Sequence, residues 1–210
     1  MAPEQTILVT STIGHIGLEL TPLLLKGNAK LVFATSNDSR LQSTFPALPK
    51  SRNATIEEGS IKHPQWVEAI IKKHAVTAVS ITITGGDELL LTLNFFDAMK
   101  RAGGIKHLIM ISGAGSYVEQ ADVAMLTRVC SAEHVLVKAT LEQKLAYAGF
   151  PWTTTILGPT LFFTNDLRSK PSMIKDKFFD ESLSEKVGCS RVSTADIALA
   201  ARNAFLDPSK

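Results

Sequence analysis

The sequence has few cysteines and little net charge. Cys130 and Cys189 are the only cysteines among 210 residues, and no paired spacing links them. They are therefore read as structural thiols of a reducing compartment rather than as part of a disulfide scaffold. The formal net charge is +2 and the basic residues are dispersed, which argues against a nucleic-acid-binding protein.

Long apolar runs and metal-ligand patterns are also missing. No stretch approaches the roughly 20 apolar residues of a membrane span, and residues 1–10 lack the pattern of a secretory signal. We therefore expect a cytoplasmic protein without membrane contact. His63, His74 and His107 are scattered singly, so no metal site is expected, and the absence of a G-x-S-x-G motif removes support for a serine hydrolase.

What the sequence does contain is an alternation of strand-like and helix-like segments. The apolar segments that indicate strands are Thr6–Thr10, Lys30–Thr35, Ala54–Glu58, Val76–Thr84, Ile105–Ser112 and Trp152–Leu157. The helical patterns begin near Ile16 and cover Pro64–Lys73, Glu88–Ala102, most of Val118–Ala148 and Ala195–Leu206. Near-continuous apolar strands separated by helices predict a doubly wound α/β domain with a parallel sheet of about six strands. Residues 1–210 are expected to form a single domain, with 160–192 as an irregular, substrate-side lid.

The first strand-to-helix turn carries a possible nucleotide-binding loop. Gly14 and Gly17 follow the apolar run Ile7–Val9, and Ser11 stands three residues before Gly14. Such a turn brings backbone N–H groups and a helix N-terminus toward a pyrophosphate. Ser11 can make the turn if its φ stays negative, and its hydroxyl could bond phosphate. The alternative is an ordinary close-packed turn.

Four segments, together with the alternation, make the whole chain resemble a family. They are "ILVTSTIGHIGLEL", "AGGIKHLIMISG", "GFPWTTTILGPTLFFTN" and "VSTADIALAARNAFLDP". With these segments the chain resembles the NmrA-like branch of the atypical short-chain dehydrogenases/reductases, which bind NAD(P) on a Rossmann fold. The resemblance implies NADP as cofactor, with NAD as the alternative.

The family pattern is incomplete at three cofactor positions. Ser11 stands where the family has its first glycine, Ser36 where it often has an arginine, and Ser60 where it usually has an aspartate. Arg40 could reach the 2′-phosphate of NADP instead, whereas Asp38 would favour NAD. The residues that the resemblance assigns to the cofactor are Ser11, Ile13, Gly14, His15, Ile16, Gly17, Ser36, Asn37, Arg40, Ser60, Ile61, Thr84, Gly85, Lys138, Pro159 and Thr160.

The Tyr-x-x-x-Lys pair of catalytic short-chain dehydrogenases is absent. Neither Tyr117 nor Tyr147, the two tyrosines of the chain, has a lysine four residues later. The lysine that matches the family is Lys138, and His134 stands four residues before it, so that the two share a helix face. Ser112 matches a serine that bonds the substrate carbonyl. His134, Lys138 and Ser112 are the catalytic candidates; the alternatives are a surface histidine, a solvated lysine and a turn-capping serine.

Three functions remain open at this stage. One is a NAD(P)H-dependent reductase of a small, apolar molecule, with a proton from His134, Lys138 or water. A second is a non-redox isomerase or cyclase in the same pocket, and the third is a non-catalytic, dinucleotide-sensing regulator. Leu161, Phe162 and Phe163 favour an apolar lid and hence an enzyme with a small-molecule substrate.

Overall fold

A six-stranded parallel sheet forms the centre of the molecule. The computed structural model describes residues 5–115, 117, 133–177, 188 and 190–207. The strands β1 (Thr6–Val9), β2 (Lys30–Thr35), β3 (Ala54–Glu58), β4 (Ala78–Ile81), β5 (His107–Ile111) and β6 (Thr153–Leu157) pair in the order β3-β2-β1-β4-β5-β6. All five pairings are parallel. The order confirms the predicted doubly wound Rossmann fold.

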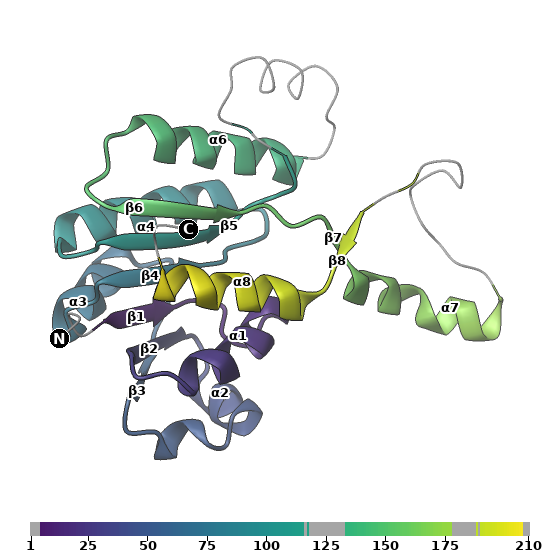
Figure 1. Ribbon diagram of the computed structural model, residues 1–210, viewed down its shortest axis with the longest axis horizontal. Coiled ribbons are helices and arrows are strands. Elements are labelled where there is room, and N and C mark those ends of the chain that lie inside the picture. Colours follow the sequence, from purple (N-terminus) through teal and green to yellow (C-terminus); the bar gives the residue numbers. More distant parts are fainter. Residues whose placement is uncertain (1–4, 116, 118–132, 178–187, 189, 208–210) are drawn as a thin grey trace.

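Helices cover both faces of this sheet (Figure 1). On one face lie α1 (His15–Leu25) and α8 (Thr194–Leu206), which pack against each other. On the other lie α3 (Pro64–His74), α4 (Glu88–Ala102) and α6 (Glu133–Tyr147). Alternate strand residues serve the two layers: Ile7 and Val9 of β1 join the α1/α8 core, whereas Leu8 joins the α3/α4 core. Burial on both sides explains why the strands are apolar throughout.

The remaining elements differ most from the sequence-based expectation. A short helix, α2 (Asp38–Thr44), and a 3₁₀ turn, η1 (Leu48–Lys50), lie between β2 and β3 and were not anticipated. Asn37 begins α2 by accepting a hydrogen bond from the Arg40 backbone N–H at 2.8 Å, a local capping signal that hydrophobic periodicity misses.

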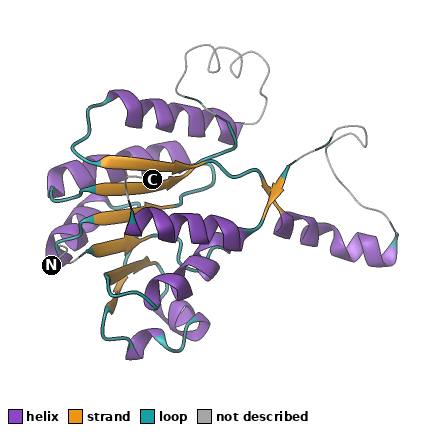
Figure 2. Cartoon of the chain, in the orientation of Figure 1, coloured by secondary structure: helices purple, strands orange, loops and turns teal. Residues whose placement is uncertain are grey.

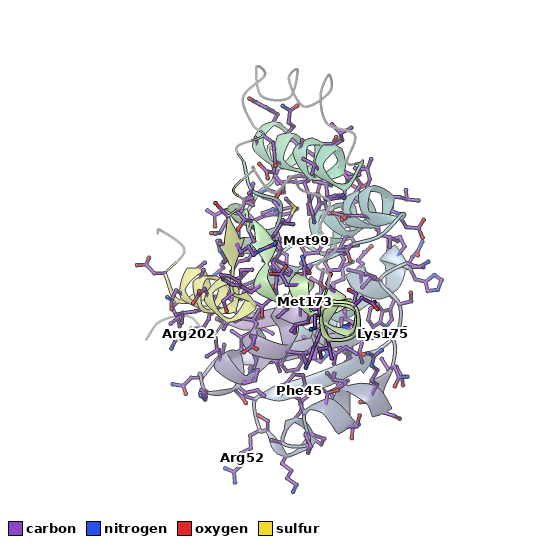
Figure 3. The ribbon with its side chains drawn as sticks, turned by 90° about the vertical axis from the view of Figure 1, so that its right-hand side faces the viewer. Phe45, Arg52, Met99, Met173, Lys175 and Arg202 are labelled. Atoms are coloured by element: carbon purple, nitrogen blue, oxygen red, sulfur yellow. The ribbon has the colours of Figure 1, made fainter. Side chains whose placement is uncertain are left out.

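Residues 160–192 were expected to be irregular loops with short elements, and the described part of this range does contain such elements. They include β7 (Leu161–Phe162), η2 (Phe163–Ser169), α7 (Lys170–Lys175) and β8 (Arg191–Val192). We call the helical run Phe163–Lys175 the arm. Figures 1 and 2 show the arm projecting from the side toward which β5 and β6 point, beyond the small β7–β8 sheet. Figure 3 looks onto the end of the arm, where Met173 and Lys175 lie in front of the sheet.

Candidate functional site

A cavity of about 780 Å³ opens at the carboxyl ends of β1, β4 and β5. The strand order reverses between β1 and β4, and ligands of doubly wound sheets bind at such a point. Its lining residues are Ser11, Gly14, His15, Ile16, Gly17, Thr82, Thr84, Ile111, Ser112, Gly113, Ala114, Tyr117, His134, Val135, Lys138, Pro159, Thr160, Leu161, Phe162, Asn165 and Ser190.

The cavity brings together many, though not all, of the residues singled out from the sequence. Those that line it are Ser11, Gly14, His15, Ile16, Gly17, Thr84, Ser112, His134, Lys138, Pro159 and Thr160. Those outside its lining are Ile13, Ser36, Asn37, Arg40, Ser60, Ile61 and Gly85. Cofactor binding by either set stays a prediction.

The glycines of the β1–α1 turn are fixed by close backbone contacts. A Cβ on Gly17 would lie 2.3 Å from the Ser11 carbonyl oxygen and 2.4 Å from that of Thr12. The Gly14 N–H donates to the Ser11 carbonyl oxygen at 2.9 Å, and α1 then begins at His15. The turn therefore presents the N-terminus of α1 to the cavity, an arrangement that suits a phosphate.

Ser11 adopts a backbone conformation that favours glycine. Its φ is +53°, so the condition of a negative φ, expected from the sequence, is wrong. Its hydroxyl donates to the Thr82 carbonyl oxygen at 2.5 Å, which ties the ends of β1 and β4 together instead of pointing to a ligand. Thr12, which sequence reasoning passed over, has a buried hydroxyl without a hydrogen-bond partner in the described part of the chain. An unpartnered donor beside a glycine cradle fits a dinucleotide phosphate in this turn.

One face of α6 carries three ionisable side chains at successive turns. His134, Lys138 and Glu142 are four residues apart and therefore share a face. His134 is exposed at the cavity wall, whereas Lys138 and Glu142 are buried. Glu142 was missed from the sequence, although its spacing from Lys138 could have identified it.

Lys138 is held by three oxygen atoms. Its Nζ lies 2.6 Å from Oε1 of Glu88, 2.9 Å from the Ile111 carbonyl oxygen and 3.5 Å from that of Ile83. The Glu88 contact is ionic, since Oε1 accepts no hydrogen bond of ordinary geometry. Two carbonyl hydrogen bonds and one ionic contact therefore hold Lys138 at the carboxyl ends of β4 and β5.

Ser112 and Tyr117 both donate hydrogen bonds to Glu142. The Ser112 hydroxyl donates to Glu142 Oε1, and the Tyr117 N–H donates to Oε2 at 3.4 Å. The Tyr117 hydroxyl lines the same cavity and donates to the Ala114 carbonyl oxygen at 2.5 Å. Tyr117 was not predicted as a site residue, because it has no lysine four residues later. A loop, rather than a helix turn, brings this phenol near Ser112.

The carboxyl end of β2 forms a separate polar region. Both carboxylate oxygens of Asp38 accept from the Gln42 side chain at 2.8 Å, and the Asn37 side chain caps α2. The Arg40 side chain is exposed, so it is accessible to a ligand. Ser36 is exposed beside them. Across the loops that follow β3 and β4, Lys62 and Asp87 pair at 3.2 Å.

The base of the arm contacts the phosphate turn. His15 Nδ1 lies 3.3 Å from the Thr164 hydroxyl, and the His15 ring is 6.5 Å from that of Phe162. Arg191 of β8 pairs with Asp166 at 3.3 Å. These contacts place Leu161, Phe162 and Asn165 on the cavity wall.

Glu57 and His107, whose pKa values are clearly shifted, do not line the cavity. Burial lowers the pKa of His107 on β5. Burial raises the pKa of Glu57, but hydrogen bonds from Lys73 and His74 outweigh it and the net pKa is lowered. No cluster of three metal-ligating side chains occurs among the described residues, and within them no helix is long and apolar enough to cross a membrane.

Comparison with known proteins gives the same picture of the fold. Residues 13–208 match the model of a family described as NAD(P)H-binding. An anaerobillin reductase from Escherichia coli superposes with a TM-score of 0.63 at 14% identity, over 97% of this chain and 92% of that one. A wide-type short-chain dehydrogenase/reductase from Veillonella parvula, in complex with NADP, gives 0.62 at 17% identity, over 97% and 88%. A yeast methylglyoxal/isovaleraldehyde reductase, complexed with NADPH, gives 0.64 at 14% identity, over 96% and 71%. No curated protein sequence matches significantly.

Proposed function

Because the chain belongs to the NAD(P)H-binding family, we propose that it is a NAD(P)H-dependent reductase of a small, apolar organic molecule. The observation that carries the proposal is the continuous cavity of about 780 Å³. Its lining runs from the glycine turn at the start of α1 to Ser112 and Tyr117. A volume of this size suits a cofactor end group together with a small substrate.

The family match and the glycine turn support one placement of the cofactor. Gly14, Gly17 and the unpartnered Thr12 hydroxyl would hold the pyrophosphate, and Thr84 would lie beside the nicotinamide half. When bound, NADPH supplies the hydride. Lys138 and Glu88 keep the ends of β4 and β5 in register beneath it.

The substrate end of the cavity is mainly apolar. Ile111, Val135, Leu161 and Phe162 contribute to its walls, together with Ala114. Water-poor walls favour an apolar substrate, and the hydroxyl of Ser112 or Tyr117, or the imidazole of His134, can orient a polar atom on it.

NADP is the proposed cofactor in preference to NAD. Both oxygens of Asp38 already accept from Gln42, so a ribose 2′-hydroxyl would have to share this carboxylate. Arg40 is exposed on the same helix and supplies a charge-assisted donor for a 2′-phosphate.

A fluorescence titration followed by an activity assay tests the proposal. Trp66 packs against Gly59, next to Ser60 and Ile61, so bound NADPH should receive energy from it. The chain has two tryptophans, and a Trp152→Phe variant leaves Trp66 as the sole donor. NADPH oxidation is then followed with menadione and benzaldehyde as apolar carbonyl probes. Failure to bind NADPH, or binding without oxidation by any carbonyl probe, contradicts the reductase.

The arm favours a second candidate, a dinucleotide-binding regulator. Phe163, Leu167 and Ile174 of the arm are 58%, 62% and 71% exposed, an unusual concentration of apolar surface. A regulator needs such a surface for a protein partner. NADPH binding without turnover, combined with loss of partner capture in an Ile174→Glu variant, would favour this candidate.

A further inference from the structure

Glu142 is a buried carboxylate that is hydrogen-bonded to two residues of the cavity lining. It is 3% exposed and accepts hydrogen bonds from the Ser112 hydroxyl and the Tyr117 N–H. The neighbouring Gln143 donates to the Tyr117 carbonyl oxygen at 3.3 Å, so α6 holds the loop after β5 at both residues. Ser112 is hydrogen-bonded to Glu142 and is itself one of the residues that line the cavity.

The two carboxylates near Lys138 have different partners. Glu88 forms an ion pair with Lys138, whereas no Lys, Arg or His of the described residues lies within ion-pair distance of Glu142. Burial of a carboxylate without a cation is costly, and two hydrogen bonds offset only part of that cost. Both oxygens of Glu142 act as acceptors, a pattern that a glutamine side chain, with one acceptor oxygen, could not reproduce. The same carboxylate can also take up a proton from Ser112, the one of its two partners that donates through a hydroxyl.

We propose that Ser112 and Glu142 form a proton path between the cavity and the interior. The proposal rests on the oxidoreductase function proposed above. In the oxidation of an alcohol, the substrate O–H proton passes to Ser112 Oγ while the Ser112 proton passes to Glu142 Oε1. A bound oxidised cofactor would accept the electron pair of the substrate C–H bond as hydride, which would leave a carbonyl. In the reduction, a proton carried by Glu142 would pass through Ser112 to the substrate oxygen, and a bound reduced cofactor would supply hydride to the carbon. After the product leaves, water that enters the cavity exchanges a proton with Glu142 through Ser112 and so restores its starting protonation state.

Substitutions separate this path from a purely structural role. Glu142→Gln keeps the shape and an acceptor for Ser112 but carries no proton. We expect unchanged NADPH binding by Trp66 energy transfer and a fall of about 10²–10⁴-fold in kcat with benzaldehyde. Ser112→Ala should give a similar fall, and the double variant no further fall, because both residues serve one path. Ser112→Thr keeps the hydroxyl and should retain most of the turnover.

A spectroscopic signature tests the path without any substrate. The Ser112 hydroxyl proton, held by a carboxylate, should give a downfield ¹H resonance that is absent in Ser112→Ala and shifted upfield in Glu142→Gln. Glu19→Gln, a substitution on the exposed surface of α1, is the matched control and should change neither resonance nor turnover.

The outcomes distinguish the path from the function on which it rests. Full kcat in Glu142→Gln, or no downfield resonance in the unmodified protein, overturns the path alone. Loss of turnover in Tyr117→Phe with normal turnover in Glu142→Gln assigns the proton to Tyr117 and also overturns it. No NADPH binding, or no oxidation with any carbonyl probe by the unmodified protein, overturns the reductase and the path together.

Discussion

Lys138 and Glu88 form an ion pair 2.6 Å long beneath the cavity, with both side chains buried. The pair links α6 to α4, and the ammonium also bonds the carbonyl oxygen of Ile111 at the end of β5 and that of Ile83, two residues after β4. Removing one member leaves the other charge buried and unpaired, which typically costs about 3–5 kcal/mol.

A double-mutant cycle at this pair should therefore be strongly non-additive. Lys138→Met and Glu88→Leu should each lower the free energy of unfolding in urea by about 3–5 kcal/mol, and the double variant by less than either. The free energies are compared from the urea midpoints, with the same denaturant slope m for all variants. Additive losses would mean that the two charges act independently.

Gly17→Ala should impair NADPH binding. The added Cβ would lie 2.3 Å from the Ser11 carbonyl oxygen, so the turn or α1 must shift. Overpacking of this kind costs about 1–3 kcal/mol, which corresponds to about 5–150-fold in Kd if it falls on the binding conformation. Gly86→Ala is the control, because its Cβ meets nothing within 4 Å. Equal NADPH affinity in both variants would count against the turn as the phosphate site.

Ser11→Gly should be more stable than Ser11→Ala. Both lose the hydroxyl bond to Thr82, but only alanine keeps a Cβ at a φ of +53°. The difference in the free energy of unfolding should be about 1–2 kcal/mol in favour of glycine. Urea titrations of the two variants measure it directly, and an equally stable alanine variant would argue against a left-handed Ser11.

Arg40→Ala should reduce the preference for NADP over NAD. Loss of one charge-assisted contact to phosphate costs about 1.5–3 kcal/mol, and NAD binding should be unaffected. The ratio of the two dissociation constants, obtained by Trp66 energy transfer, is the measurement. Arg52→Ala removes another exposed arginine as the control. An unchanged ratio in Arg40→Ala would exclude Arg40 from the 2′-phosphate site.

The free energy of unfolding should decrease as the pH falls below about 6.5, because the buried His107 resists protonation in the folded protein. Thr153 donates to the Lys106 carbonyl oxygen, so it accepts from His107 Nδ1 at 2.8 Å, and Thr155 lies 3.3 Å from Nε2. This setting suits a neutral ring, and burial lowers the pKa of His107 in the folded state. The unfolded chain therefore takes up the proton first, and the stability present above about pH 6.5 is lost in acid.

His107→Gln should flatten this pH dependence between about pH 7 and about pH 5, measured by urea unfolding. The exposed His63→Gln is the control. The lowered pKa of Glu57 contributes in a more acidic range, below about 4.5. An unchanged slope in His107→Gln would show that another group is responsible.

The sequence by itself determined the fold. Continuous apolar strands such as Val76–Thr84 predict a sheet covered on both faces, and in the structure Leu8 and Val9 indeed serve opposite layers. Gly17 was also identified from sequence, because backbone contact within one turn is a local property. The helix Glu88–Ala102 was predicted to the residue, since its hydrophobic period and the two glycines after it are local as well.

Only the tertiary structure decided which side chains meet. Glu88 and Lys138 are 50 residues apart, and Ser112 and Glu142 are 30 apart; no periodicity relates them. Tyr117 reaches the cavity through a loop, so helix spacing could not identify it. Ser11 has a positive φ, and its hydroxyl bonds the carbonyl oxygen of Thr82, which directly follows β4. Local pattern therefore specifies elements and turns, whereas the partners of buried charges are set by how distant elements pack.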